Sequence, residues 1–233
     1  MSVLDTIPAF EEDWIKKFDP QKRILTGRSY GLAKRAMDLL LVVSTLPFWL
    51  TICGVVGLII RFTSPGAPVV FSQSRTGKGG RRFSMFKFRT MVPNAEELKE
   101  KYAHLNELQW PDFKITDDPR VTSIGSFLRK TSLDELPQFV NVLRGEMSLV
   151  GPRAERPELM EMFQRHVPFY RARLLVKPGI TGWAQINFGY ASTIDETVTK
   201  LEYDLYYIKH RNLLMDLMVL IRTPATMLGF RGQ

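Results

Sequence analysis

The sequence predicts a helix-rich α/β fold, in which a re-entrant membrane helix-break-helix precedes a compact cytoplasmic domain with a small β-hairpin and interfacial amphipathic helices. Three observations carry this prediction. Residues 39–60 contain no charged side chain, the stretch 69–88 shows a hairpin pattern, and several later segments repeat apolar residues at helical spacing.

The composition fits a folded domain plus one membrane element. The chain has 233 residues, a net charge of +8, 45% hydrophobic residues and 24% charged residues. A basic chain suits anionic lipid headgroups, a phosphorylated substrate or nucleic acid. We expect no nucleic acid partner, because the basic residues are dispersed and much of the chain is apolar.

The apolar run 39–60 is long enough to cross a hydrocarbon core of about 30 Å as a helix. Pro47 lies near its middle, where it removes a helix hydrogen bond, and the nearby Ser44 can bond a freed carbonyl. Basic residues flank both ends, so the positive-inside rule places both ends in the cytoplasm. A helix that breaks at Pro47 and returns satisfies both observations, while a kinked spanning helix stays open on the residues alone.

The segments around this run are assigned in chain order. Two structures are equally expected for the N-terminal residues: an amphipathic helix near 9–18 that lies on the membrane surface, or a solvated extension. Lys34 and Asp38 are spaced for a local ion pair. Strands are expected at 69–75 and 82–88, joined by a glycine-rich turn, with Lys87 and Arg89 on one side of the second strand as an anion-binding pair.

The remaining residues are mostly helical. Helices are expected at 94–109, at 123–131, from a start within 133–137 to the C-cap Gly145, and at 155–170. Residues 177–183 read as a rigid loop. Residues 201–227 form a strongly amphipathic stretch in which aromatic and cationic residues mix with leucine, as is typical of a headgroup interface.

Asp134 and Glu135 lie between cationic residues at an expected helix start. One interpretation is structural: Ser132 and Glu135 match a capping box, although Pro137 then falls where a helix hydrogen bond is expected. The other is chemical. A carboxylate beside arginines can ligate Mg²⁺ or attack phosphorus, and guanidinium groups neutralise phosphate oxygens. Both interpretations stay open on these residues alone.

Several motifs in order resemble the bacterial sugar transferase family, the monotopic polyprenyl-phosphate phosphoglycosyl transferases in their minimal form. The resemblance runs from about Lys34 to Gly229. Its motifs are K-R-x-x-D (34–38), FKFRTM (86–91), DPRVTSIGSFLRKTSLDELPQ (118–138), NVLRGEMSLVGPR (141–153) and KPGITGWAQIN (177–187).

The resemblance implies an enzyme that transfers a phosphosugar from a UDP-sugar to undecaprenyl phosphate. Asp134 would attack the β-phosphate and form a phosphosugar-aspartyl intermediate as UMP leaves. Mg²⁺ would be held by Asp134, and Glu135 would help either with the metal or with the proton of the acceptor. Arg129 becomes a phosphate-binding candidate. Lys87, Arg89 and Arg153 are further substrate-binding candidates, and Ser44 with Pro47 would form the break of a re-entrant helix.

The implied organisation has three parts: an N-terminal extension (1–33), the re-entrant helix (34–62) and a cytoplasmic catalytic domain (63–233) on the bacterial inner membrane. Membrane lipids are expected partners, downstream glycosyltransferases are candidate partners, and a homodimer is one option for the oligomeric state. The expected pathway is the first membrane step of exopolysaccharide, O-antigen, capsule or glycoprotein glycan assembly. The sequence does not name the sugar.

Three positions depart from the family pattern. Thr45 and Leu46 separate Ser44 from Pro47, Ala154 replaces a second proline after Arg153, and residues 188–190 replace the usual Gly-Arg. Two other functions remain in competition: a membrane scaffold, which has no need of an intact acid pair, and a metal-dependent hydrolase that uses water as acceptor.

Overall fold

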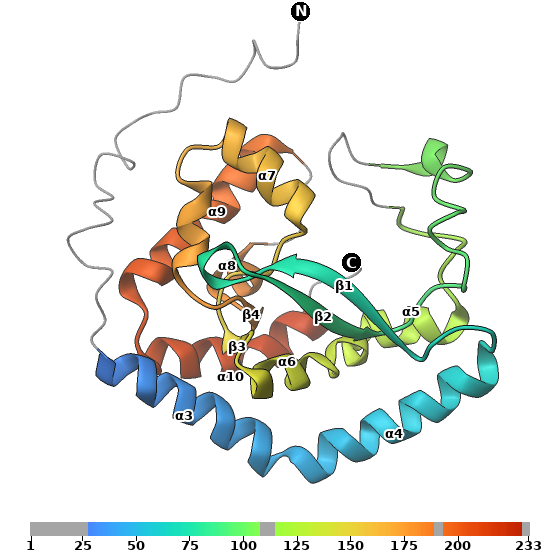
Figure 1. Ribbon diagram of the computed structural model, residues 1–233, viewed down its shortest axis with the longest axis horizontal. Helices are drawn as coiled ribbons and strands as arrows, with labels where there is room; N and C mark the ends of the chain where they lie inside the picture. The colour runs from blue at the N-terminus through green and yellow to red at the C-terminus, as the bar shows by residue number, and fades with distance from the viewer. Residues whose placement is uncertain (1–27, 108–114, 189–192, 230–233) are drawn as a thin grey trace, which may run out of the picture.

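A computed structural model describes residues 28–107, 115–188 and 193–229. The expected helix at 9–18 lies outside these residues. The fold is helix-rich with two small sheets, which confirms the predicted class (Figure 1). Its α-helices are α3 (Arg28–Ser44), α4 (Leu46–Thr63), α5 (Ser123–Lys130), α6 (Gln138–Arg144), α7 (Pro157–His166), α8 (Trp183–Asn187), α9 (Ile194–His210) and α10 (Leu213–Gly229).

The apolar run is a helix-break-helix, and α3 and α4 meet in a shallow V that opens toward the rest of the molecule (Figure 1). The break lies at Thr45, so the expectation that Pro47 is itself the turn is wrong. Pro47 occupies the first turn of α4, where a missing N–H costs little. The hydroxyls of Ser44 and Thr45 both donate to the Leu41 carbonyl, at 3.2 and 2.6 Å.

By length and composition, α4 is the one helix among the described residues that could cross a membrane. Large apolar side chains on both arms of the V are exposed, including Leu40, Phe48 and Phe62. At the apex, Trp49 donates from Nε1 to the Val42 carbonyl at 3.0 Å and packs edge-on against Phe139 of α6. The break is therefore held by a side chain that also contacts the following domain.

The K-R-x-x-D motif attaches α3 to that domain. Arg35 donates to the carbonyls of Val142 and Leu143, at 2.6 and 2.9 Å, at the C-terminal end of α6. Asp38 is buried and accepts hydrogen bonds from Ser148 Oγ and Leu149 N.

Lys34 lies 4.0 Å from Asp38 but only 3.0 Å from Asp216 of α10. The expected local Lys34–Asp38 pair is thus the weaker of the two contacts. Asp216 is fully buried and also accepts from the hydroxyls of Tyr30 and Tyr207. The charged groups just before the apolar run therefore attach α3 to the rest of the fold.

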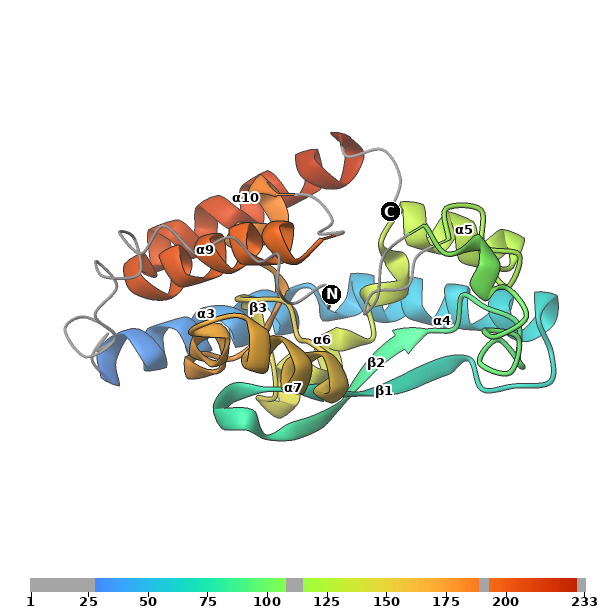
Figure 2. The same ribbon diagram turned by 90° about the horizontal axis from the view of Figure 1, so that it is seen from above.

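The hairpin was predicted almost to the residue. Strands β1 (Val70–Thr76) and β2 (Arg82–Phe88) pair antiparallel, and the 3₁₀ turn η2 (Lys78–Gly80) joins them. Gly79 and Gly80 adopt positive φ, which only glycine does at low cost. Figure 2 shows the hairpin on one side of the α3–α4 line and α9 with α10 on the other.

The sequence interpretation missed a two-stranded parallel sheet. Strand β3 (Ser148–Val150) pairs with β4 (Gly179–Thr181), which lies within the expected loop 177–183. Glycine makes this approach feasible, because a Cβ at Gly179 would lie 2.1 Å from the Gly151 nitrogen. Each strand has only three residues, too few to show a strand pattern in the sequence.

The helix expected at 94–109 is wrong over the described residues. Residues 94–102 form successive turns, followed by the 3₁₀ turn η3 (Ala103–Leu105). No side chain from 94 to 107 is buried, so the stretch has no core contact to stabilise a regular helix.

Two other helical segments are shorter than expected. The region 155–170 contains α7 and then, after Phe169 at φ 59°, the 3₁₀ segment η5 (Tyr170–Leu175). The amphipathic stretch 201–227 spans the end of α9 and most of α10. Asn212 separates these two helices and caps α10 by accepting from Met215 N at 2.9 Å. Asn212 is the signal of this boundary in the sequence.

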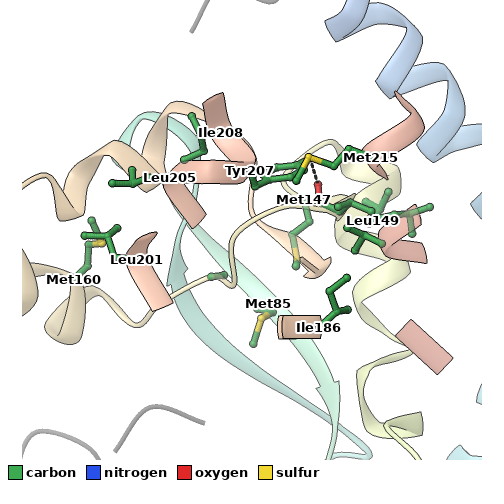
Figure 3. Close-up of a cluster of buried hydrophobic side chains, with 14 of the residues drawn as sticks. Met85, Met147, Leu149, Met160, Ile186, Leu201, Leu205, Tyr207, Ile208 and Met215 are labelled. Carbon is green, nitrogen blue, oxygen red and sulfur yellow. Dashed lines mark hydrogen bonds between the residues drawn. The ribbon is translucent and has the colours of Figure 1, made fainter. Parts of the chain in front are cut away.

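The main core joins the two sides of the molecule. Buried side chains of β2, β3, α7, α8, α9 and α10 pack together around Met85, Met147, Leu201 and Tyr207 (Figure 3). Tyr207 donates to the Val150 carbonyl at 3.2 Å. The core therefore fixes β3 and the loop that follows it, which reaches the site described below.

Glu155 belongs to a buried ionic network behind that loop. It lies 3.4 Å from Arg173 and 3.6 Å from Lys200, and Arg173 also bonds Asp204 and the Arg153 carbonyl. Burial acts to raise the pKa of Glu155, but Lys200 and Arg173 outweigh burial and lower it to about 2, against an ordinary 4.5. Ionised Glu155 therefore stabilises the fold above pH 4.5, and this stabilisation is lost as pH falls toward 2.

We expect Glu155→Gln to lower the melting temperature at pH 7 and to flatten its dependence on pH between 4.5 and 2. The expected loss of stability at pH 7 is about 1–3 kcal/mol. Thermal unfolding in detergent across this pH range measures it, with Glu158→Gln at an exposed position of α7 as control. Equal pH profiles for the two variants would contradict the assignment.

Candidate active site

The site begins with the way α5 is seated. The helix expected at 123–131 is α5, and Thr122 caps it by accepting from Gly125 N at 3.0 Å. A Cβ at Gly125 would lie 1.9 Å from the Thr90 carbonyl oxygen, so only glycine allows α5 to lie against the end of β2. Arg129, one turn later, donates from Nε to Thr90 Oγ1 at 3.0 Å.

The acid pair lies on a tight turn between α5 and α6. Ser132 adopts left-handed φ of 53°, and residues Leu133–Glu135 form the 3₁₀ turn η4. The Ser132 side chain makes no capping hydrogen bond, so the capping-box interpretation is wrong. Gly145 closes α6 at φ 78°, which confirms the predicted C-cap, and α6 begins at Gln138, one residue after the range 133–137 in which its start was expected.

Lys87 of β2 faces both carboxylates. Its Nζ lies 2.5 Å from Glu135 Oε1 and 3.8 Å from Asp134 Oδ2. Arg153, on the loop after β3, approaches Glu135 Oε1 at 3.5 Å. Four of the predicted residues, Lys87, Asp134, Glu135 and Arg153, thus come together from three separate segments.

The two carboxylates have different environments. Asp134 is only 8% exposed, and burial raises the pKa of its carboxyl, against the opposing charge of Lys87. Burial also acts on Glu135, but Lys87, Arg153 and the nearby Gln138 amide overcome it and lower the pKa to about 2. Glu135 is therefore a fixed anion that orients its cations, and Asp134 is the more basic and more nucleophilic group.

The two remaining predicted cations, Arg129 and Arg89, differ in whether they reach the acid pair. Arg129 lies close enough for its charge to lower the pKa of Asp134, so it belongs to the site. Arg89 was expected to form an anion-binding site together with Lys87, but its guanidinium does not contact the acid pair that Lys87 faces. It follows the last residue of β2, is buried, and donates from Nη2 to the Ser64 carbonyl after α4. Arg89 N still donates to the Val69 carbonyl at 2.9 Å, so the backbone pairing reaches this residue, but its guanidinium is held by Ser64.

The loop that carries Arg153 is held by hydrogen bonds, although Ala154 replaces the second proline of the family pattern. Arg173 donates to the Arg153 carbonyl, Arg75 donates to the Ala154 carbonyl, both at 3.0 Å, and Arg153 bridges to Gly179 beside β4. These backbone contacts fix the position from which the Arg153 side chain reaches Glu135.

A small pocket opens beside the acid pair. Its polar lining comes from Lys87, Glu135, Gln138 and Arg153, and the rest from Met85, Met147, Ala154 and Gly179. Sequence reasoning missed Gln138 as a site residue. The signal is its spacing, four residues after Asp134 at the first position of α6, where it lies above the same turn.

The donor set fits a metal only in part. Within the described residues, no group of three or more His, Cys, Asp or Glu side chains gathers as a metal site. Asp134 and Glu135 alone remain, and Mg²⁺ is commonly bound by one or two carboxylates together with substrate phosphates. The site therefore suits a metal that is shared with a phosphorylated substrate.

A family model described as bacterial sugar transferase matches residues 29–229 of the chain. The chain belongs to the bacterial sugar transferase family. The match covers α3 through α10 and includes every residue of the site.

Curated relatives carry informative names. A UDP-N-acetylgalactosamine-undecaprenyl-phosphate N-acetylgalactosaminephosphotransferase from Aeromonas hydrophila is 42% identical over 89% of this chain and 46% of its own length. A UDP-glucose:undecaprenyl-phosphate glucose-1-phosphate transferase from Escherichia coli (strain K12) is 39% identical over 82% of this chain and 39% of its own.

An exopolysaccharide production protein, ExoY, from Sinorhizobium fredii is 36% identical over 91% of this chain and 93% of its own length. The chain thus spans less than half of the first two relatives and nearly all of the third.

Proposed function

We propose that this bacterial sugar transferase moves a phosphosugar from a UDP-sugar to undecaprenyl phosphate. The observation that carries the proposal is the buried Asp134 carboxylate, placed beside Lys87 and Arg129 at a turn that also carries Glu135. The names of the relatives, which describe transfer of sugar phosphates to undecaprenyl phosphate, support the substrate classes.

The reaction proceeds in two displacements. A carboxylate oxygen of Asp134 attacks the β-phosphorus of the donor, the bond from that phosphorus to the bridging oxygen breaks, and UMP leaves with the bridging oxygen. A phosphate oxygen of undecaprenyl phosphate then attacks the aspartyl phosphosugar. Asp134 is released as a carboxylate, and the product is undecaprenyl-diphosphate-sugar. Burial favours the first step, because a desolvated carboxylate is a stronger nucleophile.

The cations stabilise phosphate charge in both steps. Lys87 and Arg153 are positioned by Glu135, and Arg129 of α5 acts electrostatically on Asp134. Arg89 stays a substrate-binding candidate from the sequence alone, since its guanidinium contacts the Ser64 carbonyl. Phosphoryl transfer depends chiefly on such positioning and charge neutralisation.

Mg²⁺ is the proposed cofactor, with Asp134 as ligand and Glu135 beside it. When bound, it would neutralise phosphate charge on the donor diphosphate. The short donor set described above supports a metal that arrives with the substrate.

The proposed location is the bacterial inner membrane, with the catalytic domain on its cytoplasmic face. The V of α3 and α4 has both ends on the side of the domain (Figure 1). Apolar side chains near its apex, such as Leu40 and Phe48, are exposed. This shape supports a re-entrant helix, as the flanking basic residues do. The proposed role is the first membrane step of glycan assembly, which precedes the downstream glycosyltransferases.

Release of UMP tests the proposal. Detergent-solubilised protein with Mg²⁺ is incubated with UDP-N-acetylgalactosamine, UDP-galactose or UDP-glucose, each with and without undecaprenyl phosphate. Acceptor-dependent UMP turnover, with sugar recovered in the lipid fraction, is expected for at least one donor. Without acceptor, sugar label should remain attached to the protein. Free sugar phosphate would instead indicate a hydrolase, and no product from any donor would refute the proposal.

A further inference from the structure

The Gln138 side chain is buried in the site without a complete set of hydrogen bonds. It is 2% exposed, and its Nε2 has no hydrogen-bond acceptor among the residues that the structure describes. The amide lies near enough to favour ionised Glu135, but outside hydrogen-bonding geometry. A buried donor left unpaired costs stability, so this position calls for an acceptor from outside the chain.

The surroundings define the chemistry of that acceptor. Gln138 lines the pocket with Lys87 and Arg153, two cations, and with Glu135, whose Oε1 already receives both of them. An oxygen that enters this pocket would meet two positive charges and a neutral N–H donor. Such a set is complementary to a phosphate oxygen.

Asn141, a second amide on α6, has a structural role and serves as a comparison for Gln138. Asn141, one turn later, is fully buried and completely paired. Its Oδ1 accepts from Phe86 N at 3.1 Å, and its Nδ2 donates to the Ser84 carbonyl and to Glu146, each at 2.7 Å. The hydrogen bonds of Asn141 connect α6 to β2. The Nε2 of Gln138, at the start of the same helix, makes no such connection.

We propose that Gln138 is a substrate-binding residue whose Nε2 donates a hydrogen bond to a non-bridging diphosphate oxygen of the nucleotide-sugar donor. This inference rests on the proposed function and adds a residue to it. A phosphate-binding role also explains why a neutral amide lies among charged groups. The Gln138 amide can donate to phosphate without adding a charge that would compensate that of Glu135.

The test compares Gln138→Met with Asn141→Leu, which are variants of similar shape that lack the amide. Gln138→Met removes an unpaired donor, so its melting temperature should equal or exceed that of the wild type. Its kcat/KM should fall about ten- to hundredfold, and its Kd for UDP, used as a diphosphate probe, should rise about tenfold. Asn141→Leu should instead lower the melting temperature.

Gln138→Glu is the second variant, because it keeps the side-chain length and places negative charge against the phosphate. It should weaken UDP binding more than Gln138→Met does. Unchanged kcat/KM and UDP binding in both Gln138 variants would overturn the inference while leaving the transferase intact. A loss of melting temperature like that of Asn141→Leu in both variants would assign Gln138 to structure. A wild-type protein without turnover or UDP binding would overturn both the function and this inference.

Discussion

Asp134→Asn is expected to abolish acceptor-dependent UMP release, by about 10³-fold or more, without lowering the melting temperature. An amide has the size of the carboxylate but cannot form the bond to phosphorus. Burial raises the pKa of Asp134 in the folded protein, so its ionised form opposes folding above the ordinary pKa and the neutral amide relieves that cost. Turnover of UDP-sugar and thermal unfolding measure the two effects on one sample.

Asp117→Asn is the matched control, since it makes the same change at an exposed position in a loop. It should keep wild-type turnover and melting temperature. Sugar label should also fail to attach to Asp134→Asn protein when the acceptor is omitted. Turnover that survives in Asp134→Asn would remove Asp134 as the nucleophile, and retained labelling would direct attention to Glu135.

Gly125→Ala should give a large loss of both stability and activity. The new methyl group would meet the Thr90 carbonyl oxygen at 1.9 Å, so α5 must move away from β2. Overpacking of this kind costs about 1–3 kcal/mol and more where backbone must shift, which lowers the melting temperature of a chain of this size by about 5 °C or more. Arg129 would move with α5, so kcat/KM should fall as well.

Gly31→Ala in α3 separates this clash from a general effect of alanine in a helix. A Cβ at Gly31 meets nothing within 4 Å, and alanine is favoured over glycine inside helices by about 1 kcal/mol. That variant should therefore be as stable as the wild type or more stable. Similar behaviour of the two variants would mean that Gly125 does not seat α5.

Sequence reasoning succeeded where a local rule governs the structure. The hairpin follows from its glycine-rich turn, α5 from the spacing of its apolar residues, and the end of α6 from Gly145. In the site, Lys87, Asp134, Glu135 and Arg153 were all named in advance. Local patterns and family motifs together identified these residues, although they lie far apart in the sequence.

Sequence reasoning failed where tertiary contacts decide. The stretch 94–107 has helical spacing but no core to pack against, and the pairing of β3 with β4 depends on close backbone approach at Gly151 and Gly179. Gln138 was overlooked because an amide at a helix start resembles any polar first-turn residue. Its unpaired Nε2 becomes visible only when its neighbours are in place.

The attachment of α6 at both of its ends makes this short helix a spacer of fixed length. Arg35 of α3 holds its last carbonyls, and the reactive turn lies immediately before its first residue. Seven helical residues at about 1.5 Å each set a separation of about 10 Å along the helix axis. The number of residues in α6 therefore sets the distance between the reactive turn, which carries Asp134, and the point where α3 is attached to the domain.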